Sequence, residues 1–210
     1  VNANVHTIPT VVSANEWTPL PGRLEGKLRS GSLPRIGWVG SRSTAHQLEL
    51  VEPALRRLRA EGHDFEVHVV GAGEDFVLDT VRIESRPWRQ QDEIDEFRQI
   101  DIGLAPMHSA PVYQGKCGFK QLQYMAVGVP LVSSWVGGAQ DFMVHGHNGL
   151  VARSTEDWYQ HLKALLGSAE LRGQLSRGGR ELVATRYCIE RQGPCVAQCF
   201  DEVLGYARAS

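Results

Sequence analysis

Residues 100–134 read Ile100-Asp-Ile-Gly-Leu-Ala105, then, after a polar loop, Gly118-Phe-Lys-Gln-Leu-Gln-Tyr-Met-Ala-Val127, then Pro130-Leu-Val-Ser-Ser134. The first and last runs are short and apolar, which is typical of buried strands. The middle run brings apolar side chains back to one face at helical spacing. A strand, a helix and a second strand in this order predict a βαβ unit and therefore a parallel sheet.

Four further short runs continue the same alternation along the chain. They are Arg35-Ile-Gly-Trp-Val-Gly40, Phe65-Glu-Val-His-Val-Val-Gly71, Val81-Arg-Ile-Glu84 and Gly149-Leu-Val-Ala152. Because helical patterns separate the runs, the sequence predicts an α/β fold. We expect a Rossmann-like, doubly wound parallel sheet of about six strands with helices on both faces, followed by a C-terminal helical segment.

The expected helices differ in how clearly they begin. Thr44 and Gln47 are spaced as a capping box, and the residues that follow share one apolar face: Leu48, Val51, Leu55 and Leu58. Pro53 lies inside this pattern and predicts either a kink or a later start. A second helix is expected over about residues 92–99, and nearly everything after Ser154 is helical in pattern.

The first 33 residues do not follow the alternation. Residues 2–12 read as extended chain around Pro9, and residues 19–32 are rich in Gly, Pro, Ser and charge. This composition predicts an arm over residues 1–33 that leads into a domain of residues 34–184 without contributing to its core.

The composition excludes several classes of function. The chain has 210 residues, and its 22 Lys and Arg against 24 Asp and Glu give a net charge of -2. This balance argues against nucleic-acid or membrane binding through bulk charge. No apolar run approaches the roughly 20 residues of a transmembrane helix, and a secretory signal pattern is absent. The chain begins at Val1 rather than Met, so a segment upstream is compatible with the sequence.

Four cysteines are too few to stabilise a chain of this size as disulfides. Cys195 and Cys199 are spaced to share a helix face with Cys188 nearby, but a thiolate metal site needs a loop geometry that a helix does not provide. We therefore expect reduced thiols, no metal site and a cytoplasmic location.

Function is expected where loops gather beyond the carboxyl ends of the strands. After the run 100–105, the segment Gly115-Lys-Cys-Gly118 delivers a glycine into a helix start, whose free amides bind anions. Lys116 and Lys120 add positive charge there, which suits a diphosphate. The loop after residue 40 offers Ser41 and Arg42 as a second clamp. Neither a dinucleotide fingerprint nor a P-loop occurs, which disfavours those two classes.

The order and spacing of several motifs resemble those of one protein family. The glycine-led helix with Leu122-Gln-Tyr-Met-Ala126, then Gly128-Val-Pro130, Gly137-Gly138 and Gly146-His-Asn-Gly-Leu-Val151, resembles the C-terminal, donor-binding half of group 1 (family 4) GT-B glycosyltransferases. The resemblance extends from about Val5 to the C-terminus. It implies that residues 1–33 correspond to the interdomain connection and that residues 185–210 form a helix packed against a missing N-terminal domain.

The resemblance also implies roles for single residues. Gly118 matches a glycine that approaches the donor phosphates, and the amides of Gly118 and Phe119 would bind diphosphate. Of two family glutamates, the ribose-binding one falls on Gln123 and the one near the donor sugar on Gly115, where the carboxylate is absent. The family's Arg and Lys on the first loop fall near Ser41 and Gln47, so Arg42 and Lys116 are the nearest replacements. Arg86 and Trp88 follow the third strand, where the base would lie.

We therefore expect the donor half of an enzyme that transfers a sugar from a UDP- or GDP-linked donor to an acceptor with retention, without a cofactor. The catalytic residues are unknown from the sequence, and this chain alone is expected to be inactive. Because Lys116 supplies positive charge where the family's basic residues are missing, we favour a divergent active enzyme over a domain that has lost catalysis. The alternatives are a nucleotide-binding domain without catalysis, a flavodoxin-like signalling module, and a nucleotide-sugar epimerase. The first strand ends without the acidic cluster that a signalling receiver needs.

Overall fold

The computed structural model describes residues 5–29, 31, 33–78 and 83–209, with side chains up to residue 205. Six strands form one parallel sheet in the order β3-β2-β1-β4-β5-β6. The strands are β1 (Arg35–Val39), β2 (Glu66–Val70), β3 (Ile83–Arg86), β4 (Ile102–Ala105), β5 (Leu131–Ser134) and β6 (Leu150–Ala152). The predicted α/β class and the six predicted strands are confirmed; residues 81 and 82 of the third predicted strand lie outside the described residues.

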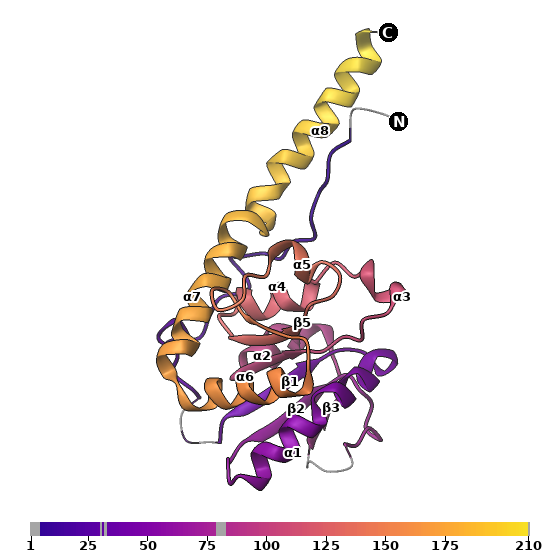
Figure 1. Cartoon of the computed structure of the whole chain (residues 1–210). Helices are drawn as coiled ribbons and strands as arrows, with labels where there is room; N and C mark the ends of the chain where they lie inside the picture. The colour runs from indigo at the N-terminus through magenta and orange to yellow at the C-terminus, as the bar shows by residue number, and fades with distance from the viewer. Residues whose placement is uncertain (1–4, 30, 32, 79–82, 210) are drawn as a thin grey trace.

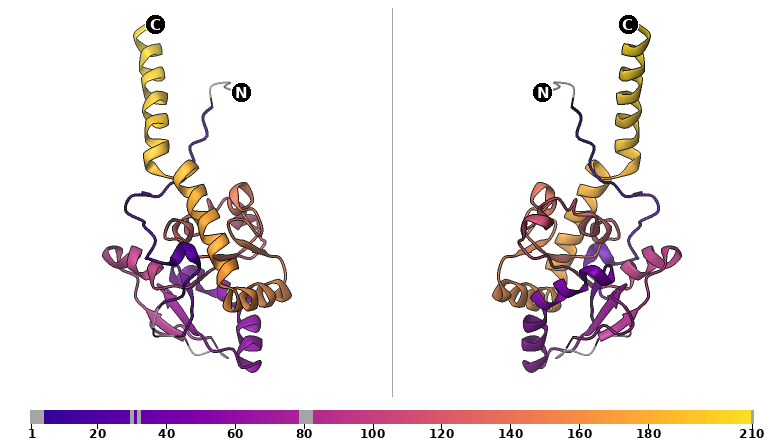
Figure 2. Two further views of the ribbon diagram at one scale, coloured as in Figure 1. Left: turned by 90° about the vertical axis from the view of Figure 1, so that its left-hand side faces the viewer. Right: turned by 90° about the vertical axis from the view of Figure 1, so that its right-hand side faces the viewer.

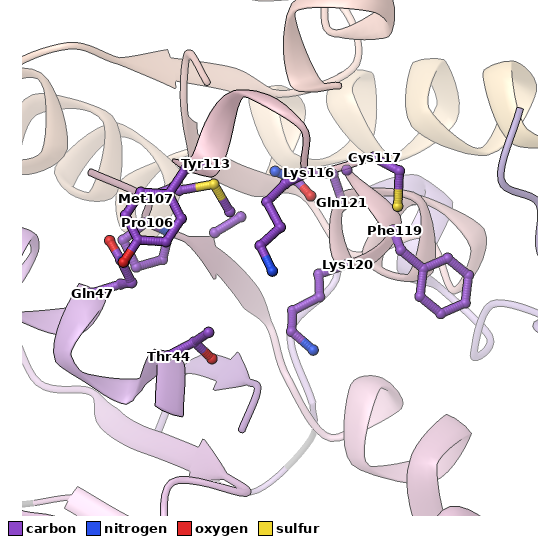
Figure 3. A pocket seen from close by; sticks show the side chains of 12 residues that line it. Thr44, Gln47, Pro106, Met107, Tyr113, Lys116, Cys117, Phe119, Lys120 and Gln121 are labelled. Atoms are coloured by element: carbon purple, nitrogen blue, oxygen red, sulfur yellow. The ribbon is translucent and has the colours of Figure 1, made fainter. Parts of the chain in front are cut away.

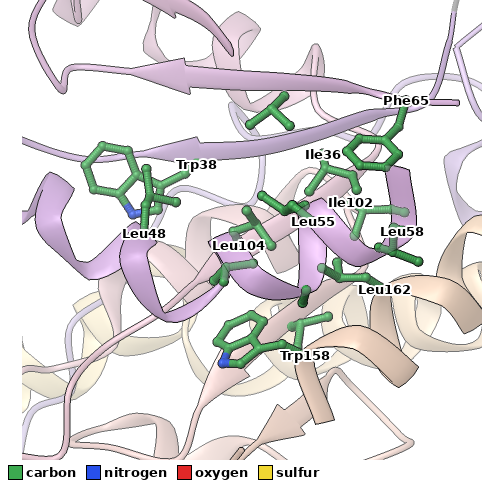
Figure 4. Close-up of a cluster of buried hydrophobic side chains, with 14 of the residues drawn as sticks. Ile36, Trp38, Leu48, Leu55, Leu58, Phe65, Ile102, Leu104, Trp158 and Leu162 are labelled. Carbon is green, nitrogen blue, oxygen red and sulfur yellow. The ribbon is translucent and has the colours of Figure 1, made fainter. Parts of the chain in front are cut away.

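Helices cover both faces of the sheet (Figure 1). The 3-10 helix η2 (Arg42–Leu50), α1 (Glu52–Ala60) and α6 (Thr155–Gly167) pack on one face over Ile36, Val67 and Leu104. Figure 4 shows the core of this face, where Leu55, Trp158 and Leu162 meet the strands. α1 begins only after η2 has ended, with Pro53 in its first turn, so the later start is the correct one of the two alternatives.

The opposite face carries α2 (Glu93–Arg98), α4 (Phe119–Ala126) and part of α7 (Ala169–Arg186). α4 is anchored to the sheet by Tyr124, whose hydroxyl donates to Gly37 O at 3.0 Å and accepts from Val39 N at 3.2 Å. Complete burial raises the pKa of Tyr124, so the phenol stays protonated. Gly103 leaves room for the Tyr124 ring, because a Cβ there would lie 2.7 Å from it. These contacts fix where α4 begins, and so position the candidate site.

The N-terminal segment differs from the expectation that it lies outside the core. Val12 and Trp17 are buried in the hydrophobic core of the face that α2 and α4 cover, and the centre of the Trp17 ring lies 5.4 Å from that of Phe97. Arg23, in the short 3-10 helix η1 (Arg23–Glu25), is buried and donates to Asp101 at 2.6 Å. The segment covers an apolar helix face that solvent would otherwise reach, which is why it packs instead of extending freely.

The C-terminal helix α8 (Ile189–Ala209) follows α7 and extends away from the domain (Figures 1 and 2). The N-terminal segment leaves the domain at the same end, where His6 Nε2 lies 3.9 Å from Glu202 Oε2 of α8. Phe200, Val203 and Leu204 are exposed on it. The domain division at residue 185 and the packing of this helix against another domain stay predictions. Among the helices in the described ranges, none combines the length and apolarity needed to cross a membrane.

Three short helices lie in the connections between the longer elements. They are the 3-10 helix η3 (Gln90–Asp92), α3 (Pro111–Gln114) and α5 (Ala139–Phe142). α3 lies in the loop between β4 and α4, and α5 follows β5. Both contact the segment that leads into α4.

Candidate functional site

The candidate site lies at the carboxyl edge of the sheet, between β1 and β4. These strands are neighbours, but the chain continues from β1 toward β2 and from β4 toward β5. Such a switch point opens a crevice in a doubly wound sheet. A cavity of about 210 Å³ occupies this place and is lined by η2, the loop after β4 and the start of α4 (Figure 3). Its lining residues are Thr44, Gln47, Ala105, Pro106, Met107, Tyr113, Lys116, Cys117, Gly118, Phe119, Lys120 and Gln121.

The N-terminus of α4 presents free amides to this cavity. Gly118 precedes the helix with a φ of 76°, a left-handed conformation that favours glycine. Its carbonyl accepts the first helical hydrogen bond, from Leu122 N at 3.3 Å. The amides of Phe119, Lys120 and Gln121 therefore have no acceptor within the helix. This arrangement places partial positive charge where an anion can bind.

Two adjacent glycines, Gly137 and Gly138, hold the segment 115–118 in place. Gly138 N donates to Lys116 O at 2.6 Å. A Cβ at Gly138 would lie 2.5 Å from Cys117 O, and one at Gly137 would lie 2.6 Å from Lys116 O. The two backbones approach so closely that only glycine fits, and the position of the turn before α4 depends on this contact.

Lys116 and Lys120 supply the charge of the site. In Figure 3 both side chains extend from the α4 side toward the space that Thr44 faces. Within the described residues neither ammonium forms an ion pair or a hydrogen bond. Burial lowers the pKa of Lys120, and the nearby positive charge of Lys116 lowers it further, while Glu93 raises it. These two cations and the free amides at the start of α4 make this end of the cavity positively charged.

The opposite wall is held by side chains that the sequence interpretation assigned differently. Gln47 is buried, and its Oε1 accepts the His108 amide at 2.6 Å, joining η2 to the loop after β4. His46 Nε2 lies 3.0 Å from Gln47 Nε2 and 3.3 Å from the Tyr113 hydroxyl. The capping box at the start of η2 is formed by Ser41 and Thr44, whose hydroxyl oxygens lie 3.1 Å apart. The predicted capping box of Thr44 with Gln47 is therefore wrong.

Ser41 and Arg42 do not line the cavity. The Ser41 hydroxyl is taken up by Ser43 and Thr44. Arg42 is exposed and donates to Asp75 Oδ2 at 2.5 Å. The pairing of Arg42 with a carboxylate was not visible in the sequence, because Asp75 is 33 positions away.

The residues assigned to ribose and base are not among those that line the cavity, and a carboxylate that the sequence did not predict connects two of them. Gln123 is 1% exposed, and its Nε2 donates to Glu93 Oε1 at 3.2 Å. Trp88 Nε1 donates to the same oxygen at 3.3 Å, while its ring is 45% exposed. Arg86 is exposed and pairs instead with Glu84 at 2.6 Å.

Phe119 and Gly115, the two other predicted positions around the start of α4, offer no side chain to the cavity. Phe119 is 39% exposed, and its ring points away from the cavity in Figure 3, so its contribution is the backbone amide. Gly115 lies exposed in the segment before α4, with open space where a side chain would be. Glu93 was missed; the available signal was an acidic residue at the start of the helix that follows Trp88. The described residues contain no cluster of three or more His, Cys, Asp or Glu suited to a metal ion.

Comparison with known sequences identifies the family. The sequence model described as glycosyl transferases group 1 matches residues 33–168, well over half of the chain. The chain belongs to this family. This group 1 sequence is 29% identical over 126 residues to a D-inositol 3-phosphate glycosyltransferase from Saccharomonospora viridis, covering 59% of the chain and 28% of that relative. The predicted resemblance is thereby confirmed.

Solved structures of glycosyltransferases share the fold of this group 1 domain. HepE from Anabaena, solved in complex with UDP-glucose, superposes with a TM-score of 0.72 at 15% identity, over 94% of this chain and 57% of that one. The C-terminal domain of a group 1 glycosyl transferase from Francisella tularensis gives 0.61 at 18% identity, over 85% and 99%. At such identities the likeness shows the fold, which is the GT-B type predicted. The chain spans about half the length of HepE and less than a third of its curated relative.

Proposed function

We propose that this chain binds the nucleotide diphosphosugar donor of a glycosyltransferase that transfers the sugar with retention of configuration. The donor is UDP- or GDP-linked, and its diphosphate occupies the N-terminus of α4. The observation that carries the proposal is the pair of uncompensated lysines, Lys116 and Lys120, beside the free amides that follow Gly118. The complex of HepE with UDP-glucose, a structure of the same fold, supports the choice of ligand.

The proposed chemistry follows from where charge develops. The bond between the anomeric carbon and the phosphate oxygen breaks, and the nucleoside diphosphate leaves with the electron pair. A bond forms on the same face of the anomeric carbon to an acceptor hydroxyl oxygen, whose proton passes to the departing diphosphate. Lys116, Lys120 and the α4 amides stabilise the departing diphosphate by dipoles and charges that are already oriented, which is an effective form of transition-state stabilisation.

Transfer also needs groups that the described site does not supply. The position corresponding to the family's sugar-side carboxylate is Gly115, and the acceptor has to be held facing the α4 end. We propose that an additional acceptor-binding domain completes the enzyme, and that α8 packs against it through Phe200, Val203 and Leu204. The chain by itself is then expected to bind the donor without turnover, and turnover by these 210 residues alone would contradict this part of the proposal.

Calorimetry with UDP, GDP and the corresponding nucleotide sugars tests the binding. Lys116→Ala is expected to weaken nucleoside diphosphate binding by about tenfold or more, because a charge-assisted contact contributes about 1.5–3 kcal/mol. An unchanged dissociation constant for Lys116→Ala, with the fold intact by circular dichroism, would contradict the assignment.

Lys163→Ala is the matched control. It removes the same charge from the chain, but Lys163 pairs with Glu61, just after the C-terminal end of α1, at the amino edge of the sheet. Its binding constant should equal that of the wild type. Equal losses in both variants would show that net charge, and not the α4 site, governs binding.

A further inference from the structure

A series of side chains that begins in the cavity wall follows the order of the parts of a nucleotide. Lys120, in the first turn of α4, lines the cavity, and Gln123 lies one turn further along the helix. Glu93 links Gln123 to the partly exposed Trp88. A nucleoside diphosphate runs from phosphate through ribose to base in the same order. If the diphosphate lies at Lys120, as the proposed function requires, the ribose reaches the side chains between Lys120 and Trp88.

Glu93 occupies that intermediate position. It is the first residue of α2, and its Oε1 accepts hydrogen bonds from Gln123 Nε2 at 3.2 Å and from Trp88 Nε1 at 3.3 Å. These two bonds orient the carboxylate from both sides. Its charge also reaches Lys120, where it acts against the effect of burial. One carboxylate therefore connects the three groups that the nucleotide would contact.

The two remaining oxygens match a diol. In the part of the chain that the structure describes, neither Glu93 Oε2 nor Gln123 Oε1 accepts a hydrogen bond. The 2'- and 3'-hydroxyls of a ribose carry two adjacent O–H donors. The free oxygens of this carboxylate and this amide, whose groups are joined by a hydrogen bond, can accept one each. Hydrogen bonds to the charged acceptor are the stronger of the two kinds.

We propose that Glu93 of α2 binds the ribose diol of the donor nucleotide and selects ribonucleotides over 2'-deoxyribonucleotides, with Gln123 as its positioning partner. This inference rests on the proposed function. The burial of the two side chains explains why the carboxylate is on α2: Gln123 is 1% exposed, and an ionised carboxylate buried there would be costly. Glu93 is only partly buried, so its charge is retained at a lower cost.

Calorimetry with UDP and 2'-deoxy-UDP tests the selection. The wild type is expected to bind UDP about tenfold more tightly, because loss of the 2'-hydroxyl leaves a charged acceptor without its donor. Glu93→Gln keeps the shape and can still accept from Gln123 and Trp88. It should weaken UDP binding by about five- to tenfold and reduce the preference over 2'-deoxy-UDP to less than about threefold. Lys116→Ala should weaken both ligands equally and leave the preference intact.

The reciprocal variants separate a ribose contact from a merely structural role. Gln123→Glu brings a second carboxylate beside Glu93 and should weaken UDP binding and lower the melting temperature, since the two charges repel. The double variant Glu93→Gln with Gln123→Glu restores one carboxylate and one amide. It should recover the preference for UDP, while its melting temperature stays below that of the wild type because the carboxylate now lies at the buried position 123.

The outcomes distinguish the two proposals. If the wild type and Glu93→Gln bind UDP and 2'-deoxy-UDP alike, while Lys116→Ala weakens both, the ribose assignment is overturned and the proposed function stands. If the wild type binds neither ligand, the proposed function fails, and this inference fails with it.

Discussion

Two loops at the same edge of the sheet look alike in sequence and differ in what they can bind. Gly40-Ser-Arg-Ser-Thr44 and Gly115-Lys-Cys-Gly118 both combine glycine with positive charge, and both lead from a strand region into a helix. In the first, Ser41 bonds to Ser43 and Thr44, and Arg42 pairs with Asp75. In the second, the two lysine ammonium groups and the first three amides of α4 have no hydrogen-bond partner among the described residues.

The difference shows that an anion site depends on which donors remain unsatisfied. Arg42 at the first loop already has a carboxylate, and its exposed ion pair contributes little to stability. At the second loop, burial lowers the pKa of Lys120 and no carboxylate within hydrogen-bond distance compensates its charge. We therefore expect the second loop to bind an anion more strongly, although both offer positive charge.

The largest effect is expected from removing both cations of the open loop. The double variant Lys116→Ala with Lys120→Ala should weaken UDP binding by about a hundredfold, because two charge-assisted contacts are lost together. Titration calorimetry measures this directly. A loss no greater than that of Lys116→Ala alone would mean that Lys120 is not a phosphate ligand, and the contrast between the loops would then rest on one residue.

A smaller effect is expected from moving the open loop without changing its charge. Gly138→Ala places a Cβ 2.5 Å from Cys117 O, so the segment before α4 has to shift. Overpacking of this kind costs about 1–3 kcal/mol, and we expect a lower melting temperature together with about tenfold weaker UDP binding. Gly205→Ala, in α8 with open space around it, is the matched control and should change neither. Unchanged binding in Gly138→Ala would show that the turn tolerates displacement.

The smallest effects are expected at the closed loop. Arg42→Ala should weaken UDP binding by less than about threefold, because the guanidinium is already paired and exposed. Asp75→Asn releases Arg42 and should strengthen binding by a similar factor, since the freed cation can approach the phosphates. A tenfold loss in Arg42→Ala would remove the distinction between the two loops and return Arg42 to the site.

Much of the fold follows from local patterns. The short apolar runs become the strands, because a strand buried on both faces by helices needs a continuous apolar sequence. Gly118 marks the start of α4 for an equally local reason, since its backbone adopts a left-handed conformation. The N-terminal segment was the main departure: its proline- and glycine-rich sequence indicated an arm, and the burial of Trp17 depended on an apolar surface formed elsewhere in the chain.

The sequence by itself determined the α/β class, the parallel sheet, the glycine-led helix and the presence of Lys116 and Lys120 beside it, because each depends on residues close together along the chain. The tertiary structure alone decided that Arg42 is neutralised by Asp75, that Gly138 supports the turn before α4, and that Glu93 joins Gln123 from 30 positions away. Such pairs form only when packing brings distant loops to one edge of the sheet. Their hydrogen bonds and charges then determine which donors remain free to bind a ligand.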